Sequence, residues 1–262
     1  MCGRYATTRS AADLTALFEA VDVSGGRVEV DYNVAPTDPV PLIRMSASRG
    51  ARVLDVARWG LIPSWATDRR VGARMINARA ETVASMKAFA IPFARRRCLI
   101  PATGWYEFAL PADGAPPAGG PGRRSKAGAK QPYFMTPLDS GPVVFAGLWT
   151  VWAGPDDDDK LLTCSIITTH AVGDLVRVHS RMPLVLSRDR WVPWLTATRG
   201  LDALLTPPSA ADVEALEIRA VGSAVGDVRN DGPQLIDPVP GYPAQGSAAL
   251  VSSPEPADLT LF

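Results

Sequence analysis

The chain contains 262 residues, 47% of them hydrophobic, and its 27 basic side chains balance its 27 acidic ones. This composition supports one large domain or two small ones, and a net charge of zero argues against a nucleic-acid partner unless basic residues gather on one face. The sequence shows no membrane span, secretory signal, disulfide framework or zinc-ligand spacing, so we expect a cytoplasmic protein without metal or cofactor.

The amino terminus reads Met1-Cys2-Gly3-Arg4-Tyr5. Removal of Met1, which the small side chain of Cys2 permits, would leave an α-amine and a thiol on one residue. An aldehyde can form an imine with such an amine, and the thiol can then close a thiazolidine ring. The pKa of an α-amine is about 8, so roughly a fifth of it is neutral near pH 7.4. We interpret Cys2 as an aldehyde-reactive residue; the alternative is an ordinary frayed terminus.

The first third of the chain combines a capped helix with a strand pair. Ser10 and Asp13 form a capping-box pattern ahead of an apolar helical face that ends at Val21. Strands are predicted at 40–45 and 52–59, after a turn at 33–36. The loop that follows contains Trp65, which could wedge against a nucleobase or fill the core.

The middle of the chain places a carboxylate on a broken strand. Residues 75–82 lead into a predicted helix that extends to Phe89, and residues 98–108 predict a strand with a kink. Strand alternation sends Glu107 to the opposite face from its two aromatic neighbours, where a plain exposed acid is the default interpretation. Residues 111–131 are rich in Pro, Gly and Ala, which predicts a flexible insertion.

Three β-rich runs follow the insertion, at 133–135, 143–152 and 161–169. Cys98 and Cys164 lie in apolar, strand-like runs, so we expect both to be inert core residues.

The last third contains both histidines of the chain. Residues 171–183 predict a short turn or helix and then a loop, in which His179 stands between two arginines. Such a histidine could exchange protons near neutral pH, although a structural role is more common. Small helices near Trp191 and Val213 and a closing strand and loop at 219–238 complete the pattern.

Eight short motifs occur in a fixed order along the chain. They are MCGRY at 1–5, YNVAP at 32–36, WGLIP at 59–63, INARAET at 76–82, RCLIP at 97–101, GWYE at 104–107, HSRMP at 179–183 and VGDVRN at 225–230. Together they resemble the SOS-response-associated peptidase family of abasic-site processing proteins. The resemblance implies a single α+β domain over residues 2–238, built on a curved, barrel-like and mostly antiparallel sheet flanked by short helices.

The resemblance also implies a function and a set of site residues. Cys2, freed of Met1, would attack the aldehyde of an abasic deoxyribose in single-stranded DNA and form a reversible thiazolidine crosslink. Asn77 would hold the amino terminus and the sugar, Glu107 would act as the acid-base group, and His179 would move protons during ring opening and reversal. Arg4, Arg79 and Arg181 would hold phosphates, and Trp65 is the candidate wedge. The family name adds an autocatalytic peptidase that removes residues ahead of Cys2.

Two further expectations concern partners. Residues 239–262 form a tail that ends in Leu259, Leu261 and Phe262, a pattern that resembles peptides bound by the replication sliding clamp. We otherwise expect a nucleoid-associated monomer. Two alternatives stay open: an N-terminal-nucleophile glutamine amidotransferase, which also begins Met-Cys-Gly, and a noncatalytic reader of single-stranded DNA in which Cys2 is incidental.

Overall fold

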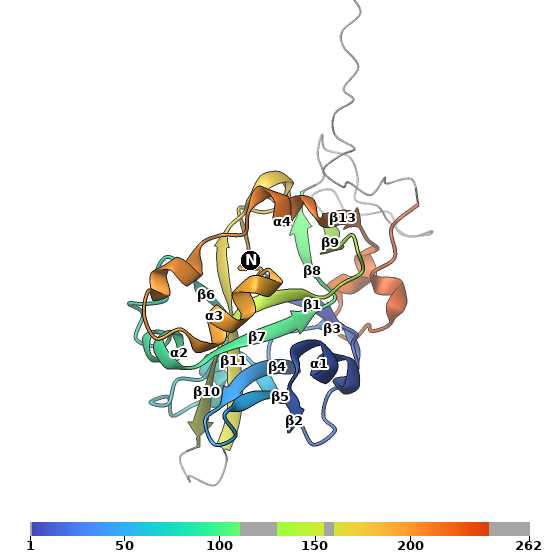
Figure 1. The fold of residues 1–262 in the computed structure, drawn as a ribbon. Coiled ribbons are helices and arrows are strands. Elements are labelled where there is room, and N and C mark those ends of the chain that lie inside the picture. The colour runs from blue at the N-terminus through green and yellow to red at the C-terminus, as the bar shows by residue number, and fades with distance from the viewer. Residues whose placement is uncertain (1, 111–129, 155–159, 241–262) are drawn as a thin grey trace, which may run out of the picture.

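The computed structural model describes residues 2–110, 130–154 and 160–240, and a closed barrel forms its centre (Figure 1). The barrel strands, in spatial order, are β11 (Lys160–His170), β10 (Val143–Ala153), β7 (Arg97–Ala102), β4 (Pro39–Ser46) and β5 (Ala51–Trp59). Neighbouring strands are antiparallel except at the closure, where β5 and β11 run parallel. The sheet is extended by β12 (Arg181–Pro183), β2 (Val21–Asp22) and β6 (Asn77–Arg79), of which β6 pairs in parallel with β11.

A second, antiparallel sheet lies beside the barrel and carries the amino terminus (Figure 1). Its strands, in order, are β13 (Leu216–Ala220), β9 (Gln131–Pro137), β8 (Gly104–Ala109), β1 (Arg4–Thr7) and β3 (Asp31–Val34). Only Thr103 separates β7 from β8, so the predicted kink is the point at which the chain passes from one sheet to the other. The predicted α+β fold with a barrel-like sheet is confirmed.

The helices are short and flank the sheets. They are α1 (Ala11–Phe18), α2 (Ala90–Arg95), α3 (Trp191–Thr196) and α4 (Ala210–Glu214), with 3-10 turns that include η1 (Arg69–Arg74), η3 (Gly173–Arg177) and η6 (Ser223–Gly226). The predicted capping box of α1 is present, because the Ser10 hydroxyl accepts from the backbone N–H of Asp13. None of the helices in the described segments is long and apolar enough to cross a membrane.

The main core fills the barrel and continues onto one face of the second sheet. Cys2, Cys98 and Cys164 are all fully buried in it. The expectation that Cys98 and Cys164 are core residues is therefore confirmed, and burial raises the pKa of both thiols. A second apolar cluster packs α1 and α3 against the outer face of the barrel.

The predicted helix leading to Phe89 is wrong. Residues 77–79 form β6 instead, and residues 80–89 continue in successive turns whose backbone hydrogen bonds mostly span three residues. The buried side chains here are Val83, Ala88 and Phe89, a spacing that does not follow the helical repeat. The described helix α2 begins only at Ala90.

The insertion is shorter than predicted at its carboxyl end. Residues 111–129 lie outside the described residues, but Gln131 is a fully buried residue of β9 whose amide donates to the Val221 carbonyl at 2.9 Å. The tail residues 241–262, including the predicted clamp-binding pattern, also lie outside the described residues.

A close approach of two glycines holds the loop that follows β5. Gly60 has φ +125°, and a Cβ placed there would lie 2.5 Å from the Gly72 carbonyl oxygen. Neither the conformation nor the contact tolerates a side chain, so the loop is pinned onto η1 at this point.

We predict that Gly60→Ala lowers the free energy of unfolding by about 3 kcal/mol, because the new methyl group combines backbone strain with a backbone clash. Gly50 is the matched control: its φ is +61°, but a Cβ placed there would meet no atom within 4 Å. Gly50→Ala should cost only about 1 kcal/mol. Urea unfolding of both variants checks this, and equal losses would contradict the role of the Gly72 contact.

Candidate functional site

Asn77 joins the barrel to the amino-terminal segment. Its backbone pairs with Ile166 of β11, and its side-chain Nδ2 donates to the Cys2 carbonyl oxygen at 2.7 Å. The Asn77 Oδ1 atom is buried and has no hydrogen-bond partner within the described residues. The amide therefore holds Cys2 with one end and offers an unused acceptor with the other.

Glu107 lies on the buried face of β8, only 5% exposed. As predicted, it faces away from Tyr106, which packs with Phe108 in a separate cluster, whereas Trp105 shares the main core with Cys2. The interpretation of Glu107 as an exposed acid is therefore wrong. Across the sheet its register partner is Tyr133 of β9.

The pKa values of Glu107 and Cys2 depend on burial and on nearby charges. Burial raises the pKa of Glu107 to about 7, and the positive charges of the amino terminus and Lys130 oppose that rise. Burial, followed by the charge of Glu107, raises the pKa of the Cys2 thiol well above its usual value. At neutral pH the thiol is thus protonated, and Glu107 can either accept or donate a proton.

His179 follows η3 and faces the same charges. Burial lowers the pKa of its imidazole, and the charge of the amino terminus is the next contribution. Its Nδ1 accepts from the backbone N–H of Arg181 at 2.9 Å, so the neutral ring carries its proton on Nε2. Cys2, Asn77 and Glu107 are thus linked by a hydrogen bond and by charge, and His179 responds to the same two positive charges as Glu107.

Arg4 is tied into the protein. Its Nη1 donates to Asn33 Oδ1 at 2.7 Å and to the Val225 carbonyl at 2.8 Å. The amide of Asn33 in turn donates to the carbonyls of Asp227 and Asn230. The YNVAP motif therefore connects the closing motif to the amino-terminal strand.

Arg181 and Arg79 differ in how far the protein already uses them. Arg181 makes a bidentate pair with Glu81, with two N–O distances of 3.0 Å, and also donates to the Thr168 carbonyl at 2.7 Å. Arg79 is exposed, and its guanidinium has no ion pair among the described residues. Of these two arginines, only Arg79 is therefore an uncommitted cation.

Trp65 is 54% exposed, as a surface wedge requires, rather than part of the core. The Lys87 ammonium lies 5.2 Å from the centre of its ring. An exposed aromatic face beside a cation can stack on a base while the cation meets a phosphate.

Sequence reasoning missed Lys130 and Glu81. Lys130 stood inside the predicted insertion, yet it directly precedes β9 and its charge acts on both Glu107 and His179. Glu81 was visible within the INARAET motif, but nothing in the sequence showed that it meets Arg181, 100 residues away.

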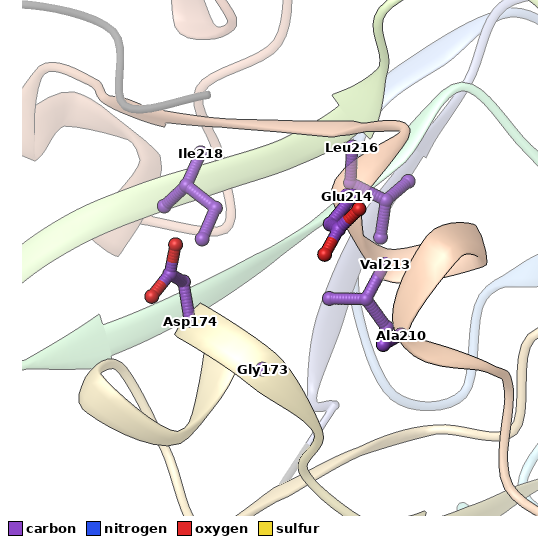
Figure 2. A pocket seen from close by; sticks show the side chains of 7 residues that line it. All are labelled: Gly173, Asp174, Ala210, Val213, Glu214, Leu216 and Ile218. Atoms are coloured by element: carbon purple, nitrogen blue, oxygen red, sulfur yellow. The ribbon is translucent and has the colours of Figure 1, made fainter. Parts of the chain in front are cut away.

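A separate cavity of about 250 Å³ lies between η3 and the α4–β13 segment (Figure 2). Asp174 and Glu214 turn their carboxylates toward it over an apolar floor that includes Ile218. None of the predicted site residues lines this cavity. Within the described ranges, no group of three or more His, Cys, Asp or Glu residues could hold a metal ion.

The raised pKa of Glu107 predicts a pH-dependent stability. The folded chain keeps a proton on Glu107 up to about pH 7, whereas the unfolded chain releases it near pH 4.5. Ionisation of Glu107 therefore lowers the free energy of unfolding as the pH rises through this window. Glu107→Gln should not show this decrease, and above pH 7 its free energy of unfolding should exceed that of the wild type by up to about 3 kcal/mol.

Urea unfolding of the wild type and Glu107→Gln at about pH 5 and about pH 8 measures the effect. The exposed Glu214→Gln serves as the matched control and should follow the wild type at both values. A difference between Glu107→Gln and the wild type that is the same at both pH values would show that burial does not raise this pKa.

Comparisons with known proteins agree with the geometry. The family described as SOS response associated peptidase (SRAP) matches residues 1–228. The abasic site processing protein YoaM of Bacillus subtilis is 34% identical over 242 residues, which cover 90% of this chain and 98% of YoaM. The abasic site processing protein HMCES of Gallus gallus is 28% identical, and the alignment covers 96% of this chain and 82% of HMCES. A crystal structure from Bacteroides thetaiotaomicron shares the fold, with a TM-score of 0.71 at 22% identity over 90% of this chain and 99% of that one. The chain therefore belongs to the SOS-response-associated peptidase family.

Proposed function

We propose that the protein processes abasic sites in single-stranded DNA by forming a covalent, reversible thiazolidine crosslink through Cys2. The observation that supports it best is the 2.7 Å bond from Asn77 to the Cys2 carbonyl, which fixes the amino-terminal segment beside a buried carboxylate of raised pKa. The relatives named as abasic site processing proteins support the same substrate. In this proposal residues 2–238 form the reactive unit, which acts as a monomer.

The chemistry requires the amine to react before the thiol. After removal of Met1, the α-amine of Cys2 adds to the ring-opened sugar aldehyde, and loss of water from the adduct gives an imine. Glu107 accepts the proton of the ammonium and returns one to the departing hydroxyl. The Cys2 S–H then adds across the C=N bond, with sulfur on carbon and the proton on nitrogen. Addition of water reverses the sequence.

His179 opens the sugar. In its protonated form the ring gives its Nε2 proton to the ring oxygen as the hemiacetal C–O bond breaks, and the anomeric hydroxyl gives its proton to the Glu107 carboxylate, which leaves the aldehyde. The neutral ring that results can donate from Nδ1 to the Arg181 carbonyl oxygen. Asn77 Oδ1, buried and unpartnered in the described chain, accepts a hydrogen bond from the amine or the sugar. Neither role requires the asparagine to titrate.

DNA binding uses the basic and aromatic side chains at the surface. Arg79 is the primary phosphate contact because its guanidinium is uncommitted. Arg4 contributes a fixed positive charge near the site, and Arg181, whose charge Glu81 balances, is a secondary phosphate contact. Trp65 stacks on the base beside the gap, with Lys87 at its ring. Binding that depends on phosphates weakens as salt rises.

The family name supports a second, autocatalytic activity, the removal of Met1 with Glu107 as acid-base group. Intact-mass spectrometry of purified Glu107→Gln reports it: retained Met1 on this variant, but not on the wild type, supports autocatalysis. Loss of Met1 from both proteins assigns the cleavage to a separate aminopeptidase.

We predict that Cys2→Ala abolishes the band of reduced mobility that the wild type forms with an abasic oligonucleotide in denaturing electrophoresis. Noncovalent binding in native gels should persist and remain sensitive to salt, because the phosphate contacts are intact. Cys98→Ala, which removes a buried thiol of the same core, is the matched control and should crosslink as the wild type does.

Two outcomes would select another function. A wild type that binds abasic DNA without any covalent band, unchanged in Cys2→Ala, identifies a noncatalytic reader. Release of ammonia from glutamine without DNA reactivity identifies an amidotransferase.

We also propose that the tail binds the replication sliding clamp through Leu259, Leu261 and Phe262, on the basis of its sequence pattern. A peptide of residues 254–262 should bind purified clamp in fluorescence polarisation, and replacement of these three residues by alanine should remove binding. If a known clamp peptide binds under the same conditions and this one does not, the tail has another role.

A further inference from the structure

Glu81 has no role in the chemistry described so far, although it belongs to the same motif as Asn77. We infer that Glu81 is a positioning residue for His179 and acts through Arg181. The inference rests on the proposed function for its meaning in catalysis, but its structural core can be measured without DNA.

Glu81 forms a bidentate ion pair with Arg181. Both guanidinium Nη atoms donate to the carboxylate, Nη1 to Oε1 and Nη2 to Oε2, each at 3.0 Å. Nη2 also donates to the carbonyl and hydroxyl of Thr168 at 2.7 and 3.2 Å. The Arg181 side chain is only 11% exposed, so this planar pair fixes it in one geometry.

The Arg181 backbone contacts the imidazole of His179. The Arg181 N–H lies 2.9 Å from Nδ1, and the Arg181 carbonyl oxygen lies 3.2 Å from the same atom. A neutral ring accepts from the N–H at Nδ1, and a protonated ring can donate to the carbonyl. One residue therefore serves Nδ1 in both protonation states and holds the imidazole in one orientation.

Charges near His179 also depend on Glu81. The groups that act on His179 are the amino terminus, Lys130 and Arg181, all of them positive, and together with burial they lower the pKa of the imidazole. Glu81 neutralises one of the three, and the exposed His170 is its other partner, with 3.3 Å between Nε2 and Oε1. Burial is the largest single influence on Glu81 and opposes its ionisation, but the hydrogen bonds from Arg181, a backbone hydrogen bond and the charges of Arg181 and His170 together lower the pKa of the carboxyl, so Glu81 is ionised at neutral pH.

These contacts and charges give Glu81 a function that a merely structural ion pair lacks. Loss of its charge leaves Arg181 uncompensated two residues from His179, which makes protonation of the imidazole harder. Loss of the bidentate pair frees the Arg181 side chain. The Arg181 backbone, which contacts Nδ1 of His179, is then less constrained.

The experiment is an NMR titration of the free protein. The chain has only two histidines, and the His170→Gln variant assigns the remaining imidazole signals to His179. In the wild type, long-range ¹H–¹⁵N spectra should show the tautomer with the proton on Nε2. In Glu81→Gln the His179 titration should move to lower pH, whereas Glu81→Asp, which keeps the charge, should return it toward the wild-type midpoint.

The matched control is Asp174→Asn. Asp174 also pairs with an arginine, Arg177, at 3.7 Å and lies closer to His179 in sequence, but it does not contact Arg181. The titration midpoint of His179 in Asp174→Asn should match that in the wild type. An unchanged His179 midpoint and tautomer in Glu81→Gln would overturn the inference, even if that variant were less stable.

The rate of crosslinking separates the role of Glu81 from the proposed function. With abasic oligonucleotide, Glu81→Gln should crosslink about tenfold more slowly, with a pH profile displaced in the same direction as the titration. If the wild type forms no crosslink, the proposed function fails while the titration still decides the role of Glu81. A slower Glu81→Gln whose pH profile coincides with the wild type would reduce Glu81 to a fold-stabilising residue.

Discussion

The strand β11 is the constraint on which the site depends. It pairs with four strands, namely β10 and β12 in antiparallel and β5 and β6 in parallel orientation. The β5 pairing closes the barrel, and the indole of Trp59 at its end donates to the Ile76 carbonyl at 2.9 Å. The β6 pairing then delivers Asn77 to the Cys2 carbonyl, and the β12 pairing holds Arg181, two residues after His179, opposite His170 of β11. Residues that are far apart in the sequence thus reach the amino terminus from the two edges of one strand.

A chain of zero net charge can still bind a polyanion if some of its cations are bonded within the protein and others are left at the surface. Arg4 and Arg181 donate hydrogen bonds to protein partners, so their charge is held in place with little conformational freedom left to lose. Arg79 and Lys87 lie at the surface, where they can follow a flexible strand. This division suits a ligand whose damaged sugar must be fixed while its flanking phosphates vary.

Local patterns in the sequence predicted the elements whose structure depends on nearby residues. The capping box of α1, the β4–β5 pair and the kink at Thr103 need only short-range information. The turns at 80–89 were mistaken for a helix because their shape follows from the β6–β11 pairing, which no local pattern reports. The same limit applies to the site: the motifs named Glu107, but its burial could not be read from β8 alone, because β8 pairs with β1 and β9 from distant parts of the chain.

Burial acts in opposite directions on the acid and the base of this site. It raises the pKa of Glu107 to about 7 and lowers that of His179 below its usual value. Glu107 thereby titrates near neutrality and the His179 imidazole is mostly neutral there, so at pH 7 the site holds a carboxyl able to give up a proton and a largely uncharged imidazole. The same burial keeps the Cys2 thiol protonated, which in the proposed reaction would delay sulfur attack until an imine exists. A cysteine buried in an apolar core would be inert by itself; in the proposed reaction Glu107 and His179 supply the proton transfers that the burial of the thiol makes necessary.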